Sequence, residues 1–170
     1  MRLCAFVAIL FSLTKKVNAQ RNSNNAELAN QYAASGDCDK AIVYFDNYYD
    51  QDPLNAYPGY LKCLLSLKEY DKAEKLIKKH SKKFSNDPSF KVDLANVYEL
   101  KGDNDKAKKT YSEIIKNIPP DINQVNLLGN AFMQRQQFDY AAQTYIQGRK
   151  ALPNRFTWFI SGGMFLIISE

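Results

Sequence analysis

The residues of this 170-residue chain most able to do chemistry are one histidine, three cysteines and a dense run of lysines. Because His80 is the only histidine, a site with several histidine ligands is excluded, and a Ser-His or Cys-His catalytic pair is disfavoured. Gly162-Gly163 has neither the spacing nor the lysine of a phosphate-binding loop. The sequence therefore predicts no catalytic residue, no metal site and no cofactor.

The lysine run surrounds His80 and could attract an acidic partner or lipid headgroups. It consists of Lys72, Lys75, Lys78, Lys79, Lys82 and Lys83. Such runs are typical of a solvated helix face, and this one lacks the interleaved aromatic residues that stack on bases. Residues 1–19 hold three basic residues and no acid, so the net charge of +5 falls to +2 without them. We predict no nucleic-acid partner.

The N-terminus has the layout of a secretory signal peptide. Arg2 precedes an apolar run from Leu3 to Leu13, and small residues end at Ala19, which predicts a leader of residues 1–19 cleaved before Gln20. The run is too short to span a bilayer. The alternative is an uncleaved hydrophobic anchor that contacts the membrane. Since the chain contains no Asn-x-Ser/Thr acceptor, we expect export to the periplasm or outer envelope of a bacterium.

The elements that must position these residues show an internal repeat. Four strings share one pattern, and their alanines are 32, 34 and 34 residues apart: Cys38-Asp39-Lys40-Ala41, Tyr70-Asp71-Lys72-Ala73, Asn104-Asp105-Lys106-Ala107 and Phe138-Asp139-Tyr140-Ala141. Other columns stay in register: Leu28, Tyr60, Leu94 and Leu128, followed by Ala29, Leu61, Ala95 and Gly129. Apolar residues recur every three or four positions, which predicts two amphipathic helices per unit.

Local chemistry supports the same division into helices. The four aligned aspartates are expected in the first turn of each second helix, where a carboxylate meets free N–H groups and the positive end of the helix dipole. Gly36 and Gly102 are predicted to end first helices in a left-handed conformation. In the second unit Lys68 replaces this glycine, and Pro58-Gly59 interrupts the first helix. We expect a shortened or kinked helix there.

This layout resembles the tetratricopeptide repeat over roughly residues 22–155. The resemblance implies an all-α fold, a right-handed superhelix of four hairpins at about 22–53, 54–87, 88–121 and 122–155. First helices would line a concave face that binds a peptide or a partner helix. Cys38 and Cys63 would then lie near the same end of adjacent antiparallel helices. A disulfide and two buried thiols are both compatible with this placement, and we favour the thiols.

The predicted partner-binding residues project from the middle of the first helices. One column contains Asn30, Lys62, Asn96 and Asn130, and Glu99 and Met133 lie one turn further along. A carboxamide offers both a donor and an acceptor, which suits binding to a peptide backbone. The alternative is that these amides bond neighbouring repeats or face water.

The tail, residues 156–170, departs from the repeat because it is apolar on every side and too short to cross a membrane. It could cap the fourth hairpin, insert into a partner or membrane, or begin a truncated fifth repeat, which we favour. We expect a non-catalytic envelope scaffold that binds a protein or peptide. The alternative is the sensor or substrate-recruiting portion of a longer enzyme, such as a membrane kinase or peptidase. No oligomeric state is predicted.

Overall fold

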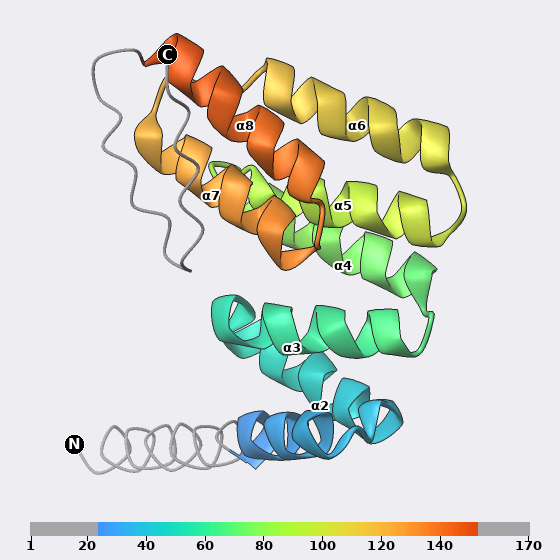
Figure 1. Ribbon diagram of the computed structural model, residues 1–170. Helices are drawn as coiled ribbons and strands as arrows, with labels where there is room; N and C mark the ends of the chain where they lie inside the picture. The colour runs from blue at the N-terminus through green and yellow to red at the C-terminus, as the bar shows by residue number, and fades with distance from the viewer. Residues whose placement is uncertain (1–23, 153–170) are drawn as a thin grey trace, which may run out of the picture. The chain divides into compact units, whose positions relative to one another are not determined.

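The computed structural model describes residues 24–152. The predicted leader and apolar tail lie outside the described residues. Within residues 24–152 the chain folds into eight helices in four consecutive hairpins (Figure 1), which confirms the all-α prediction. Residues 24–35 form the first described helix, followed by α2 Cys38–Gln51, α3 Pro53–Ser66, α4 Tyr70–Lys83, α5 Ser89–Leu100, α6 Asn104–Lys116, α7 Ile122–Gln134 and α8 Phe138–Ala151.

The turn inside each hairpin has one geometry in all four units. One residue per turn adopts a positive φ: Gly36 at 84°, Lys68 at 58°, Gly102 at 87° and Gln136 at 59°. In every turn the next residue donates its backbone N–H to the carbonyl oxygen five residues earlier, at 2.9 Å: Asp37 to Tyr32, Glu69 to Leu64, Asp103 to Tyr98 and Gln137 to Phe132. This is the Schellman arrangement that closes a helix C-terminus. The predicted role of Gly36 and Gly102 is confirmed, and Lys68 and Gln136 take the same conformation.

The first helix of the second hairpin is not shortened, so that part of the prediction was wrong, while the expected kink stays a prediction. Helix α3 runs without a break from Pro53 to Ser66 and contains Pro58, so it is as long as α2 and α4. It starts well because Pro53 occupies its first turn and the Asp52 side chain accepts a hydrogen bond from the Asn55 N–H. Gly59 has a packing role, since a Cβ there would overlap the Phe45 ring.

Small residues permit close approach of the helices elsewhere too. The four aligned alanines, Ala41, Ala73, Ala107 and Ala141, are buried, with at most 2% of their surface exposed. In the fourth hairpin Gly129 faces Tyr145, and a Cβ at Gly129 would fall on the Tyr145 ring. The predicted first-turn position of the four aspartates is also confirmed.

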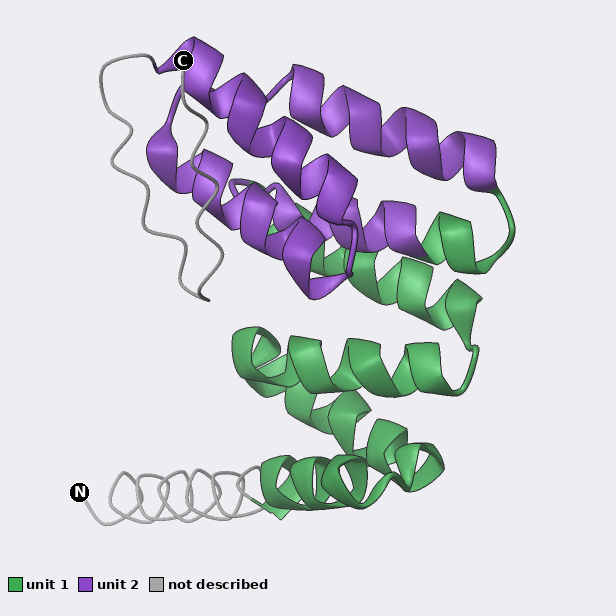
Figure 2. Ribbon diagram, in the orientation of Figure 1, with its two compact units in different colours: residues 1–85, 97–103 green, residues 86–96, 104–170 purple. Residues whose placement is uncertain are grey.

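The described residues belong to two compact units, coloured separately in Figure 2. Among the described residues, one unit comprises 24–85 with 97–103, and the other comprises 86–96 with 104–152. In the first unit α3 packs on α2 and α4, and in the second α8 packs on α7 and α6. The superhelical path of the whole array, and the concave face that depends on it, stay predictions.

Candidate partner-binding surface

The six predicted binding residues divide between the two units. In the first unit Asn30 and Lys62 are exposed, on the helix of residues 24–35 and on α3, and Glu99 is exposed near the end of α5. In the second unit Asn96 is half-buried. Asn130 is exposed and Met133 half-buried, three residues apart on α7. Residues at this spacing share one helix face, so α7 brings these two together.

The three predicted asparagines differ from other exposed amides of the chain. Asn47 and Asn117 donate side-chain hydrogen bonds to backbone oxygens of their own helical turns, at 3.3 and 2.8 Å. Asn30, Asn96 and Asn130 make no side-chain hydrogen bond to any residue that the structure describes. Within residues 24–152 they therefore do not serve to join neighbouring repeats.

The exposed face of α7 is larger than the sequence analysis predicted. Asn123, Asn126, Leu127 and Gln134 are exposed on the same helix as Asn130. The opposite face packs inward through Val125, Leu128, Gly129, Ala131 and Phe132. Sequence reasoning missed these additional residues, although one signal was present: residues 122–134 contain no charged side chain.

The lysines of α4 form a solvated face, as the composition indicated. All six lysines of the run are exposed. Three of them pair with acids: Lys72 with Glu69 at 3.2 Å, Lys78 with Glu74 at 2.6 Å and Lys79 with Asp50 at 2.8 Å. Because half of the run is compensated, its attraction for an acidic partner is weaker than the residue count indicates.

A second cationic group ties the end of α5 to α4. The Lys101 Nζ lies 2.7 Å from Asp71 Oδ1 and 3.3 Å from Glu74 Oε2. The hydrogen bond from Lys101 lowers the pKa of Asp71, and hydrogen bonds from Lys78 and then Lys101 lower the pKa of Glu74. These shifts follow from favourable contacts between opposite charges, and they describe a structural ion-pair network and not a catalytic group.

His80 is a core residue of the first unit. Only 1% of its surface is exposed, and its Nδ1 lies 2.9 Å from the Tyr49 hydroxyl oxygen. Its ring stacks on Tyr57 at a centroid distance of 4.0 Å and lies 4.6 Å from the Phe84 ring. A histidine surrounded in this way packs and bonds inside the protein, so we assign His80 a structural role in the core of the first unit.

Two buried polar contacts also have structural roles. Tyr60 donates a hydrogen bond to Asp46, and burial, followed by this bond, raises the pKa of the Tyr60 hydroxyl. In the second unit Arg135 pairs with Asp93, whose exposed fraction is 4%. The pair connects α5 to the turn after α7. Removing the Asp93 carboxylate from water is costly, and the Arg135 guanidinium beside it offsets part of that cost.

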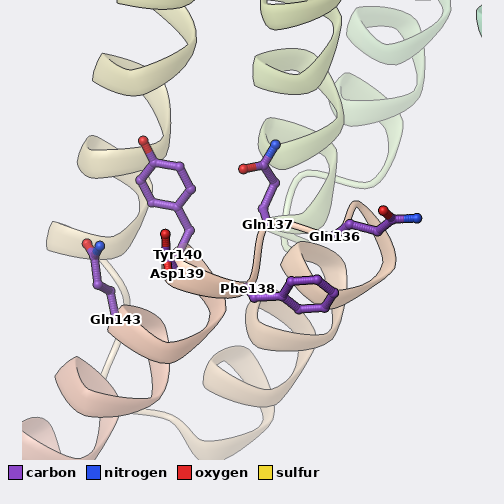
Figure 3. A pocket seen from close by; sticks show the side chains of 6 residues that line it. All are labelled: Gln136, Gln137, Phe138, Asp139, Tyr140 and Gln143. Atoms are coloured by element: carbon purple, nitrogen blue, oxygen red, sulfur yellow. The ribbon is translucent and has the colours of Figure 1, made fainter.

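A pocket of about 320 Å³ lies at the start of α8 (Figure 3). It is lined by Gln136, Gln137, Phe138, Asp139, Tyr140 and Gln143. None of the six predicted binding residues lines it, and its lining contains no Ser, Thr, Cys, Lys or His side chain. Within the described part of the chain no group of three His, Cys, Asp or Glu residues could hold a metal ion.

Our preference for two free thiols was wrong. Cys38 and Cys63 form a disulfide, with 5.0 Å between their Cα atoms. The bond joins the start of α2 to the C-terminal half of α3, as the predicted antiparallel placement allows.

Among residues 24–152 no helix is long and apolar enough to cross a membrane.

Fold and surface together define a class of protein: an array of helical hairpins with equivalent turns, buried alanines and an exposed polar face on its first helices. Residues 92–119 match the tetratricopeptide repeat family model. The match falls on the third hairpin, and the other three hairpins share its sequence columns and turn geometry, so the described chain is an array of tetratricopeptide-like repeats. Repeats of this kind are generally modules of protein–protein interaction.

Solved structures of MamA proteins are similar to this chain. One crystal structure of MamA is 20% identical, with 81% of this chain and 83% of that chain covered and a TM-score of 0.49. MamA from Desulfovibrio magneticus RS-1, from residue 41 to its end, is 17% identical, with 76% and 75% covered and a TM-score of 0.47. No curated protein matches the sequence significantly. At these identities no property of MamA beyond its fold carries over to this chain.

Proposed function

We propose that this chain is an exported, non-catalytic interaction module that binds a partner peptide or helix through its first helices. The observation that carries the proposal is the set of exposed or half-buried first-helix amides, Asn30, Asn96 and Asn130, whose side chains have no hydrogen-bond partner among residues 24–152. A side-chain amide that makes no hydrogen bond to these residues can donate to and accept from a ligand. Glu99 and Met133 lie on the same helices as Asn96 and Asn130, and Lys62 lies on the remaining first helix, α3. These three residues complete the proposed surface.

Two features support export to an envelope compartment. Residues 1–19 have the composition of a signal peptide. The Cys38–Cys63 disulfide is a bond that persists in oxidising compartments such as the periplasm and is rare in the cytosol. N-terminal sequencing of the protein from a bacterial host tests this part, and the first residue of the mature protein is expected to be Gln20. Recovery of the whole chain with reduced cysteines from the cytoplasm would overturn it.

The binding part is tested by capture from an envelope extract. The wild-type chain is compared with a variant that carries Asn30→Ala, Asn96→Ala and Asn130→Ala, which we expect to lose the captured partner because each change removes a donor and an acceptor. The matched control carries Asn47→Ala, Asn86→Ala and Asn117→Ala, which removes as many amides from positions outside the first helices. Equal capture by the first variant and the wild type would remove the first-helix surface as the binding site.

A further inference from the structure

Helix α4 and the turn before it carry the most concentrated charge of the described chain. Residues 68–83 contain seven lysines and three acids, a net charge of +4, whereas residues 24–152 hold 18 basic and 17 acidic residues, a net charge of +1. No other helix in residues 24–152 exceeds a net charge of +2. Four exposed lysines at spacings of three, four and three residues share one face of α4, which we call the lysine stripe: Lys72, Lys75, Lys79 and Lys82.

Much of the charge on this face is not neutralised. Lys75, Lys82 and the neighbouring Lys83 make no hydrogen bond or ion pair with any residue that the structure describes. Lys72 and Lys79 pair with acids at 3.2 and 2.8 Å, but their side chains are 56% and 63% exposed. Exposed pairs of this kind contribute little free energy, so an anionic ligand can compete for both lysines.

The lysine stripe offers a ligand positive charge without apolar surface. None of the large apolar side chains exposed in residues 24–152 lies on α4, whose apolar face is buried through Ala73, Leu76 and Ile77. The centres of protein–protein interfaces are depleted in lysine and enriched in aromatic residues, so this face is a poor match for a folded protein. Helix α4 also has no exposed aromatic ring on which the bases of a nucleic acid could stack.

A layer of lipid phosphates fits this chemistry. The lysine ammonium is a compact, hydrated point charge on a flexible stem, so it attracts anionic headgroups without a fixed bonding geometry. Each lysine near an anionic bilayer adds to the attraction, and clusters of about four to eight basic residues are typical of segments that dock on such surfaces. From Lys72 to Lys82 the stripe spans about 15 Å along one helix, so its ammonium groups can reach a flat surface together.

We propose that the lysine stripe of α4 docks this protein on the surface of a bilayer that contains anionic phospholipids. The attraction is electrostatic and involves no insertion of α4, because this helix has no large exposed apolar side chain. Helix α4 is a second helix and carries none of the six predicted partner-binding residues. The proposal therefore goes beyond the proposed function and does not depend on it.

The test measures binding of the full chain to lipid vesicles by sedimentation. Vesicles of phosphatidylcholine and phosphatidylglycerol in equal parts are expected to bind the protein at least about tenfold more tightly than vesicles of phosphatidylcholine alone. Raising NaCl from about 0.05 to about 0.5 M is expected to remove this difference, because salt screens surface charges. The uncharged vesicles measure any binding through the apolar residues 3–13 and 156–168, which does not depend on lipid charge. Equal binding to both lipid mixtures would overturn the proposal.

Two triple variants locate the docking on α4. Lys75→Gln, Lys82→Gln and Lys83→Gln together remove three charges without breaking an ion pair, and we expect binding to the anionic vesicles to weaken by about tenfold or more. The matched control removes the same charge from exposed positions of α6 and carries Lys108→Gln, Lys109→Gln and Lys116→Gln. The control is expected to change the affinity by less than about twofold. Circular dichroism checks that both variants are folded. Equal losses in the two variants, or no loss in the α4 variant, would contradict the proposal.

Competition with soluble anions separates a bilayer surface from other ligands. Glycerol 3-phosphate, matched to the vesicles in total phosphate, is expected to displace little protein, because it lacks the surface that gathers the charges. Displacement by it would show that the stripe binds single phosphate groups, and tighter binding to polyglutamate than to the vesicles would show an acidic polypeptide as the ligand. Either result would overturn the proposal. The vesicle assay needs no peptide partner, so failure of the first-helix surface would leave its outcome unaffected.

Discussion

Four residues at equivalent positions end the first helices, and two of them are not glycine. Lys68 and Gln136 adopt φ values of 58° and 59°. A side chain in the left-handed region brings its Cβ close to the following carbonyl oxygen, a contact that glycine avoids. The hairpin geometry is evidently imposed by the rest of the fold at these two turns, against local preference.

The first prediction uses this difference. Lys68→Gly is expected to raise the free energy of unfolding by about 0.5–1 kcal/mol, because it removes a left-handed side chain at an exposed position. Gly36→Ala, at a φ of 84° with no atom within 4 Å of an added Cβ, is expected to lower it by about 1 kcal/mol through backbone strain alone. Urea unfolding measures both, and a lower midpoint for Lys68→Gly would contradict the interpretation.

The second prediction concerns Lys101 and acid. The pKa values of Asp71 and Glu74 are lowered in the folded chain, so their ionised forms stabilise the fold above the ordinary values of 3.8 and 4.5. That contribution is lost as the pH falls through the lowered folded values. Lys101→Met is therefore expected to be less stable than the wild type at neutral pH, with the difference shrinking below about pH 4.

The difference is measured from urea unfolding of the wild type and of Lys101→Met between neutral pH and about pH 4. Lys91→Met is the control, because it removes an exposed lysine that has no acidic partner among residues 24–152. Its difference from the wild type is expected to stay constant. A Lys101→Met difference that is independent of pH would show that the contact with Asp71 and Glu74 does not stabilise the fold.

At the scale of elements, α2 and α3 are held together by packing and by a covalent bond. Phe45 of α2 approaches Gly59 of α3 and stacks on Tyr60, with the ring centroids 5.7 Å apart. The Cys38–Cys63 disulfide crosses the same helix pair and closes a loop of 25 residues. The proline that was expected to disrupt α3 is tolerated because the helix is fixed along its length by these contacts.

The third prediction follows from the closed loop. A crosslink over 25 residues restricts the unfolded chain, and its loss is expected to cost about 3 kcal/mol. Cys38→Ser with Cys63→Ser should lower the free energy of unfolding, measured by urea unfolding, by that amount relative to the oxidised wild type. Dithiothreitol should have a similar effect on the wild type and none on the variant. Equal stability with and without the reductant would mean that the bond does not form in solution.

At the scale of the whole molecule, the array is continuous in sequence but described as two units. Helix α5 contributes residues to both, since the division falls between Asn96 and Val97. Contacts in such arrays are made between neighbouring hairpins, so an end that lacks a neighbour exposes apolar surface. Residues 156–170 add an apolar segment at that end.

The fourth prediction concerns residues 156–170, which are apolar over most of their length. A chain that ends at Arg155 is expected to be more soluble than the full chain, because it lacks this apolar segment. Soluble yield and light scattering at matched concentrations measure this. Equal or lower solubility of the shortened chain would favour a cap on the fourth hairpin instead.

The fold was largely predictable because it depends on local sequence patterns. The alanine column, the three- and four-residue periodicity and the first-turn aspartates each depend on neighbours within one hairpin, and the structure confirms them. The candidate binding surface was predictable only in part. Asn130 and Met133 were identified from their column, whereas Asn126 and Leu127 were missed, because their columns contain unlike residues in the other repeats.

The sequence by itself determined the number of hairpins, their register and the scarcity of catalytic groups, since these depend on residue type and spacing. The tertiary structure decided what depends on distance. It paired Cys38 with Cys63, kept α3 whole around Pro58, buried His80 among aromatic rings and left Asn130 without a side-chain hydrogen bond among residues 24–152. Each of these outcomes is set by contacts between helices, and a one-dimensional pattern does not specify which side chains meet across them.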